Sequence, residues 1–245
     1  MTLIDTHAHL DAAGGIPALS STPDGQAPTK VIAVTNLPSR FVRLRKISHD
    51  RVHWALGLHP GQPHPRTTID DFIALLPTCT AVGEIGLDST PTDSPHAVPL
   101  DRQRDELDAI LNHPETALRL VSIHSRRSVP LVLEHLRNAA IPGGVLHWFT
   151  GTPAQARQAA DAGAYFSINA KMSRKPDLLT TLPRDRVLLE TDAPHTGAHT
   201  RPGDVRPVLT MLADAWSITL AEAEEQVIGN QQEILGAVQV TPIGH

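Results

Sequence analysis

Short hydrophobic runs recur along the whole chain, and longer stretches of mixed polarity separate them. The runs are rich in Val, Ile and Leu and do not alternate strictly with polar residues, which is typical of parallel strands buried on both faces. The pattern therefore predicts eight strands, at residues 2–5, 30–36, 52–58, 80–87, 118–123, 143–148, 164–169 and 186–191.

Helical patterns occupy the segments between the runs. Residues 101–113 put their apolar side chains on one helical face, and Thr152 followed by Pro153 is typical of a helix start. The tail at 218–238 predicts two helices, the first of them capped near Thr219. Clusters of Pro and Gly predict loops, at residues 14–28, 60–66 and 89–99.

Strands that alternate with helices indicate a single (β/α)8 TIM barrel. A length of 245 residues suits such a barrel as one domain, and no linker or internal repeat divides the chain, so we expect one domain over residues 1–245. A doubly wound open sheet is the alternative fold. It would spread the ends of the strands along a line, whereas a barrel brings them together.

The composition restricts the classes of function. The formal net charge of −5 gives the molecule no global attraction for nucleic acid, so contacts with phosphate would depend on local positive charge. Fourteen histidines suggest metal or acid–base chemistry, whereas only eight residues carry Phe, Trp or Tyr rings, which argues against a long base-stacking channel. We expect a cytoplasmic protein, because the chain has a single cysteine and an N-terminus that does not resemble a signal peptide. We expect no membrane span, because the sequence has no long apolar run.

Ionisable residues of the metal-ligand type follow six of the eight predicted strands. His7 and His9 stand two positions apart, so both side chains point to the same side of a strand. In a barrel these strand ends converge where active sites of this fold lie. Four histidines and two carboxylates could fill the coordination shells of two metal ions and leave positions for water. The residues at the strand ends are His7, His9, His59, Glu84, His124, His147 and Asp192.

Seven motifs, spread over almost the whole chain, resemble those of the TatD family of metal-dependent deoxyribonucleases, within the amidohydrolase-like barrels. The resemblance implies that His7, His9 and Asp192 hold one divalent ion, that His124 and His147 hold a second, and that Glu84 bridges both. The motifs are IDTHAHLD (4–11), GLHPGQ (57–62), AVGEIGLD (81–88), VSIHSRRS (121–128), VLHWFTG (145–151), LLETDAP (188–194) and GNQQEIL (229–235).

The same resemblance implies an activity. We expect a hydrolase that cleaves phosphodiester bonds of DNA as a 3′–5′ exonuclease, with a metal-activated water as the nucleophile. Asp192 and Glu84 would be catalytic, Asp192 accepting the proton of the water. His59 and Arg126 would contact the substrate phosphate, the guanidinium in a bidentate manner. Mg²⁺ or Mn²⁺ is the favoured cofactor, Zn²⁺ is also compatible, and DNA is the expected partner.

Two other functions remain open at this point. The chain could be another hydrolase of the same superfamily, acting on an amide, lactone or phosphotriester, although that class often bridges its metals with a carboxylated lysine where Glu84 stands. It could also be a subunit of an assembly, for example in phage defence, with weak or no catalysis.

Several residues near the predicted site also keep two interpretations. Trp148, which stands where the family usually has a small residue, either stacks a nucleobase or fills a gap beside the barrel. Glu190 shares the side of Asp192 and could support the ligands. His195 and His199 either contact substrate or are solvated.

Overall fold

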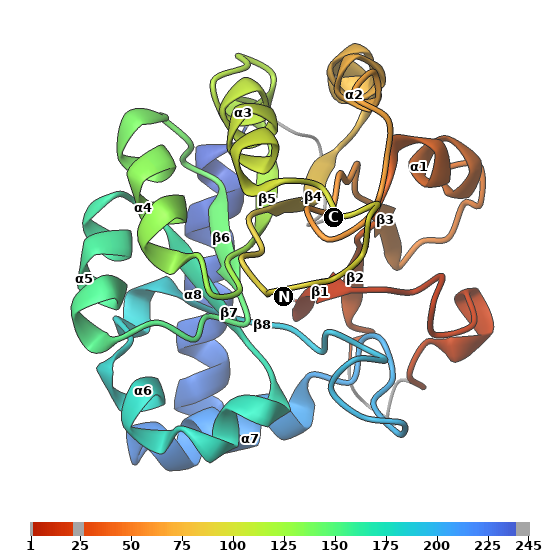
Figure 1. The fold of residues 1–245 in the computed structure, drawn as a ribbon. Coiled ribbons are helices and arrows are strands. Elements are labelled where there is room, and N and C mark those ends of the chain that lie inside the picture. The colour runs from red at the N-terminus through yellow and green to blue at the C-terminus, as the bar shows by residue number, and fades with distance from the viewer. Residues whose placement is uncertain (1, 22–26, 239–245) are drawn as a thin grey trace.

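The protein is described by a computed structural model that covers residues 2–21 and 27–238. Part of the loop expected at 14–28, and the two ends of the expected domain 1–245, lie outside the described residues. Eight parallel strands form one sheet that curves into a barrel, with helices around it, as Figure 1 shows. Each predicted run overlaps one strand: β1 (Ile4–Ala8), β2 (Lys30–Ala33), β3 (Val52–Trp54), β4 (Ala81–Gly86), β5 (Leu120–His124), β6 (Gly144–His147), β7 (Tyr165–Ile168) and β8 (Val187–Leu189).

The strands are ordered β3-β2-β1-β8-β7-β6-β5-β4, so each strand from β4 to β8 pairs with its neighbour in the chain and β8 pairs with β1. The ring closes between β3 and β4 through the residues that follow β3. Leu56 forms a parallel bridge with Val82, and the Gly83 amide donates to the Leu56 carbonyl at 2.8 Å. This order confirms the predicted (β/α)8 barrel and excludes the open sheet.

An α-helix follows each strand from β2 to β8, whereas β1 is followed by a short 3-10 helix (Ile16–Ala18), and a further α-helix ends the described part. Helix α5 begins as the sequence predicts, because the Thr152 hydroxyl accepts a hydrogen bond from the Gln155 amide and Pro153 occupies the first turn. The helices are α1 (Pro38–Leu44), α2 (Thr68–Leu75), α3 (Leu100–Leu111), α4 (Val129–Asn138), α5 (Pro153–Asp161), α6 (Pro176–Thr181), α7 (Arg206–Trp216) and α8 (Leu220–Ala237).

The tail corrects one prediction, because residues 220–237 form a single helix rather than two. Thr219 caps it as expected, but the helix continues through Gly229. A glycine inside a helix costs about 1 kcal/mol relative to alanine. Contacts made by the next turn offset that cost: the Asn230 amide donates to the carbonyls of Arg184 and Val187, each at 2.7 Å. The helix is therefore continuous because it is anchored at the start of β8.

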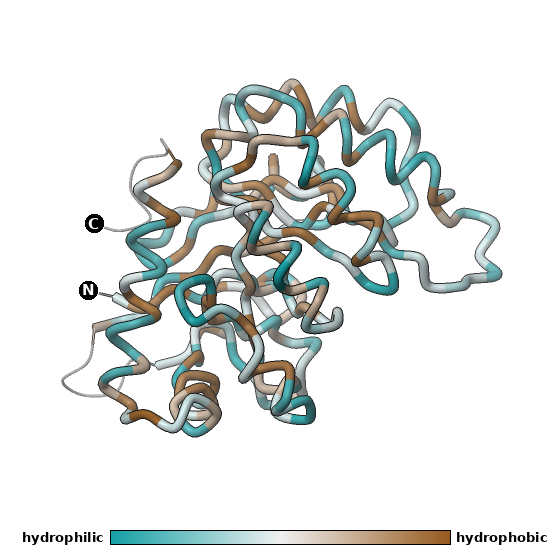
Figure 2. The backbone as a smooth tube through the Cα atoms, turned by 90° about the vertical axis from the view of Figure 1, so that its left-hand side faces the viewer, coloured by the Kyte–Doolittle hydropathy of each residue, from teal (hydrophilic) through white to brown (hydrophobic). Residues whose placement is uncertain are grey.

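Hydrophobic side chains fill the space between the barrel and the helices, and Figure 2 shows the hydrophobic stretches running through the interior of the molecule. A second buried cluster joins residues of the strands, among them Ile4 and Leu188, with Ile234 of α8. Helix α8 thus covers the end of the barrel where the strands begin. Within residues 2–21 and 27–238, no helix is both long and apolar enough to cross a membrane.

Candidate metal centre

The carboxyl ends of the strands meet around a cavity of about 630 Å³ at the mouth of the barrel. Five of the six residues predicted as metal ligands line this cavity, and the sixth, His7, is fully buried. The structure thereby brings together all six candidate ligands from five strand ends: His7, His9, Glu84, His124, His147 and Asp192.

One carboxylate oxygen of Glu84 faces a group formed by His7, His9 and Asp192, called here the first donor group. Glu84 Oε2 lies 3.3 Å from His9 Nε2 and 3.8 Å from His7 Nε2. The two Nε2 atoms are 3.3 Å apart, and each lies 3.6 Å from Asp192 Oδ1. Four potential ligand atoms from β1, β4 and the end of β8 therefore surround one point.

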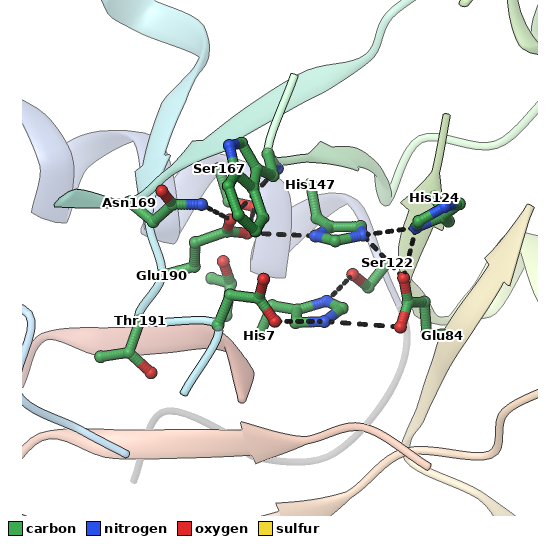
Figure 3. Close-up of polar contacts among 12 residues, drawn as sticks. His7, Glu84, Ser122, His124, His147, Ser167, Asn169, Glu190 and Thr191 are labelled. Atoms are coloured by element: carbon green, nitrogen blue, oxygen red, sulfur yellow. Dashed lines mark hydrogen bonds and ion pairs between the residues drawn. The ribbon is translucent and has the colours of Figure 1, made fainter. Parts of the chain in front are cut away.

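The other oxygen of Glu84 faces His124 and His147, the second donor group. Glu84 Oε1 lies 2.7 Å from His124 Nδ1 and 2.8 Å from His147 Nε2, and these two nitrogens are 3.2 Å apart. His59 Nε2 approaches the same oxygen at 3.5 Å. Figure 3 shows His7, His124 and His147 turned toward Glu84, which lies between the two groups.

The two donor groups fit divalent metal ions. Ligand atoms that share one ion at bond lengths of about 2.1 Å lie about 3.0–3.5 Å apart. The spacings within the two groups, from 2.7 to 3.8 Å, extend to either side of this range. Glu84 Oε2 is buried and has no hydrogen-bond partner within the described protein. An unpaired buried carboxylate oxygen is costly, and a cation beside it removes that cost. Imidazole nitrogen and carboxylate oxygen together suit Mg²⁺, Mn²⁺ and Zn²⁺.

A second layer of polar side chains orients the histidines. Ser122 Oγ lies 2.7 Å from His7 Nδ1, and Asp88 Oδ2 lies 3.2 Å from His124 Nε2. Each contact leaves the other ring nitrogen for a metal, as is usual for metal-ligating histidines. Asp88 is held in place by α3, because its backbone amide donates a hydrogen bond to the side-chain oxygen of Gln103 at 2.9 Å.

Glu190 is fully buried behind the second donor group, with Oε2 at 3.8 Å from His147 Nδ1. Its carboxylate accepts hydrogen bonds from the Ser167 hydroxyl and, at 2.7 Å, from the Asn169 amide (Figure 3). Glu190 therefore lies beside His147, and its carboxylate also forms, with His7 and His147, a group of atoms within ligand range of one another.

The charges of the cluster oppose one another. Burial disfavours the ionised Glu84, but the neighbouring His59, His147 and His124 outweigh it and hold the pKa of this carboxyl well below its usual range. Burial and the nearby His147 hold the pKa of His7 well below its usual value. Burial raises the pKa of Asp192 to about 7. Burial disfavours the charged forms of His9, His124 and His147, but Glu84 outweighs it and raises their pKa values. Without a metal, His7 is therefore neutral while the other three rings favour a proton, which a metal must displace because neutral imidazole is the form that binds metals.

Two histidines lie closer to the donor groups than the sequence indicates. His59, predicted to contact phosphate, has its ring nitrogen within ligand range of Glu84 and His124. His195 forms a similar group with His9 and Asp192, and its ring lies edge-on to that of His9 with centroids 4.6 Å apart. The position of His195, three residues after Asp192, is the only sequence signal that could have indicated this.

The substrate-facing candidates also line the cavity. Arg126 follows β5 and is exposed, and Trp148 follows β6 and is partly buried. His199 is exposed and is absent from the lining of the cavity. Arg126 therefore lies where a phosphate bound at the donor groups could reach it.

Comparison with known proteins points to one family. The family model described as TatD related DNase matches residues 4–236. The human deoxyribonuclease TATDN3 is 27% identical over 93% of this chain and 88% of its own length. The uncharacterized metal-dependent hydrolase YjjV of Escherichia coli is 28% identical, over 93% and 95% of the two chains.

Solved structures show the same fold. The crystal structure of YjjV superposes with a TM-score of 0.78 and 24% identity, covering 96% of this chain and 98% of that one. A TatD family hydrolase from Entamoeba histolytica superposes with a TM-score of 0.74 and 16% identity over the same shares. These likenesses concern the barrel and its arrangement of helices.

Proposed function

This chain belongs to the family of TatD-related deoxyribonucleases, which includes metal-dependent hydrolases, and from this premise we propose that it hydrolyses phosphodiester bonds of DNA. The observation that carries the proposal is the position of Glu84, whose two oxygens face two separate donor groups at the bottom of one cavity. A carboxylate in this position can bridge two ions, and paired ions are a common means of phosphodiester cleavage.

We propose that the first donor group holds one divalent ion, that the second holds another, and that Glu84 bridges them. Such ions lower the pKa of a water molecule and neutralise charge that builds up on the phosphate oxygens. Asp192 accepts the proton of the attacking water, and Arg126 pairs with non-bridging phosphate oxygens. His59 either contacts the phosphate, as the sequence predicts, or joins the second donor group, as its 3.5 Å approach to Glu84 favours.

We further propose that the enzyme removes nucleotides from a 3′ end. The oxygen of water bonds to phosphorus, the bond to the 3′ oxygen of the preceding sugar breaks, and a 5′-nucleotide leaves. A cavity of about 630 Å³ supports this mode, because it has the size of a small-molecule pocket rather than of a channel for duplex DNA.

Metal-stripped protein, reloaded separately with Mg²⁺, Mn²⁺ or Zn²⁺, tests the proposal on single- and double-stranded DNA labelled at either end. We expect metal-dependent shortening from the 3′ end, with single nucleotides as the product. Cleavage of an amide, lactone or phosphotriester panel without cleavage of DNA would instead favour another hydrolase of the superfamily. Failure to cleave any substrate with any of the three metals would favour a subunit without catalysis.

A further inference from the structure

Trp148 has a backbone conformation that bulky residues seldom adopt. Its φ is 41°, in the left-handed region, where an aromatic residue is an outlier and marks a strained position. Strain of this kind persists where the surroundings impose it, often at binding sites. Trp148 is such a position, because it lines the cavity of the candidate metal centre directly after His147.

A buried carboxylate imposes this conformation. The Trp148 amide donates to Glu190 Oε1 at 3.1 Å, and Glu190 is fully buried and fixed in turn by Ser167 and Asn169. The next residue, Phe149, is fully buried against Phe166, with ring centroids 5.1 Å apart. The strained turn therefore separates two consecutive aromatic residues: Phe149 enters the core, and Trp148, which packs partly against the core, also lines the cavity.

The indole is chemically distinct from everything else around this cavity. Among the described residues that line it, Trp148 is the one aromatic residue that is not a histidine. Arg126 and Thr150 line the same cavity, so a residue with a flat apolar ring and one with a guanidinium border the space that the donor groups also line. This combination matches a nucleotide, whose phosphate takes a cation and whose base offers a π face.

We propose that Trp148 is the base-stacking platform of the site, holding the nucleobase of the nucleotide whose phosphate lies at the donor groups. The inference rests on the proposed function and adds the part of the substrate that is recognised. Because every base has a π face, stacking tolerates any base but requires that one be present. The enzyme then discriminates between DNA ends with a base and ends without one, rather than between sequences.

Two probes that differ only in the base test this directly: 2′-deoxyadenosine 5′-monophosphate and 2-deoxyribose 5-phosphate, each titrated by calorimetry into metal-loaded protein. Stacking is worth about 1–3 kcal/mol per base, or about 5- to 150-fold in affinity. We expect the unaltered protein to prefer the nucleotide by a factor in this range. Trp148→Ala should abolish the preference and leave the affinity for the sugar phosphate unchanged, while Trp148→Phe should keep part of it.

Intrinsic fluorescence gives an independent readout. The chain has three tryptophans, and Trp54 and Trp216 are only 6% and 3% exposed. The nucleotide should quench the emission of the unaltered protein and of the control variant Trp54→Phe, but not that of Trp148→Phe.

Three outcomes would overturn the inference. The first is that Trp148→Ala keeps the preference for the nucleotide, and the second is that this variant has a lower affinity for both probes, by the same factor, together with a lower melting temperature. The third is that the unaltered protein shows no preference. The second outcome would mean that the indole only packs. Failure of the proposed function looks different, because it is an absence of DNA cleavage with every metal while the affinities for the two probes can still be measured.

Discussion

Asp192 illustrates how one residue connects the backbone of the barrel to its candidate chemistry. Its φ of 46° is left-handed, its amide donates to the His7 carbonyl at 2.9 Å, and its own carbonyl accepts from the His195 amide at 2.8 Å. This turn directs the carboxylate toward both histidines of the first donor group. Asn adopts left-handed backbone at least as readily as Asp, so the charge can be removed without disturbing the turn.

We therefore expect Asp192→Asn to fold normally and to cleave DNA at least about a hundredfold more slowly, since loss of a general base typically costs a hundred- to ten-thousandfold. Cleavage rates at saturating metal, beside a melting curve, provide the measurement. Asp204→Asn is the matched control, because Asp204 is exposed in the same loop. An unchanged rate in Asp192→Asn would assign the proton to another group.

Arg126 and Arg127 are neighbours that make a second matched pair. Both are exposed, but only Arg126 lines the cavity. Lysine keeps the charge and loses the bidentate contact with phosphate. Arg126→Lys should lower kcat/KM on DNA about tenfold, the loss of one charge-assisted hydrogen bond worth about 1.5 kcal/mol. Arg127→Lys should cleave like the unaltered protein and both variants should bind the same amount of metal; equal kcat/KM values for the two would remove Arg126 from the substrate site.

Residues at the ends of strands could be predicted from the sequence, whereas residues on the loops could not. The convergence of His7, Glu84 and His124 follows from strand parity and barrel closure, both of which are visible in the pattern of apolar runs. His195 approaches His9 because of the left-handed turn at Asp192. Asp is among the residue types that adopt this conformation, but the residue type alone does not locate the turn. The strained position of Trp148 depends in the same way on Glu190, more than forty residues further along the chain.

At the scale of helices and strands, helix α3 binds the loop that follows His59 and holds it in place. Arg102 on α3 donates to the carbonyls of His64 and Pro65, at 3.0 Å and 2.8 Å, and to Glu106 Oε1 at 2.8 Å. His64 Nε2 lies 3.1 Å from the same Glu106 oxygen. A buried carboxylate therefore connects the helix to one side of the cavity mouth.

Glu106→Gln should weaken this connection in a pH-dependent way. Burial disfavours the ionised Glu106, but His64 and Arg102 outweigh it and hold its pKa below the ordinary value of 4.5. A carboxyl whose pKa is lower in the folded state stabilises the fold above its unfolded pKa and loses that contribution as the pH falls through its folded pKa. We expect a loss of about 1–3 kcal/mol in the free energy of unfolding at pH 7.

Urea unfolding between pH 3 and pH 7 provides the measurement, and the difference from the unaltered protein should shrink below about pH 4.5. Asp105→Asn, at an exposed neighbouring position, should show no such difference. A constant difference at every pH would mean that shape rather than charge makes the connection.

The order of the strands and helices could be predicted from the sequence more accurately than the residues at which each one begins and ends. The alternation of apolar runs and helical patterns predicted eight strands in a ring, because the chain needs a crossover connection, usually a helix, to return for the next parallel strand. The division of the tail into two helices was wrong, because Gly229 weakens a helix locally while Asn230 and Gln231 anchor it through contacts with residues far away in the sequence. Local propensity carries no information about such contacts.

At the scale of the whole molecule, the donor groups connect strands from both halves of the barrel, so bound metal should stabilise the entire fold. A ligand present at about 100 times its Kd stabilises by about 2.7 kcal/mol, which raises the melting temperature by about 5–10 °C in a chain of this size. A chelator should lower the melting temperature by that amount, and added metal should restore it. A variant with His7→Ala and His9→Ala should respond much less; an equal response would place the metal elsewhere.

The single cysteine reports the same change independently. Cys79 is 4% exposed, and burial raises the pKa of its thiol to about 11. Thiolate is the reactive form, so alkylation at pH 8 requires unfolding. Labelling should therefore be faster after the chelator is added, and rapid labelling of the metal-loaded protein would show that Cys79 is exposed by local opening instead.

The donor groups draw on the first strand of the chain and on the turn after the last strand, and this affects when activity can arise. During synthesis the ribosome releases His7 early, but Asp192 emerges only after all eight strands have left the exit tunnel. A barrel cannot close around Glu84 before β8 pairs with β1. A half-made chain therefore has no assembled donor groups, and the proposed hydrolytic activity arises only after the last strand has paired with the first.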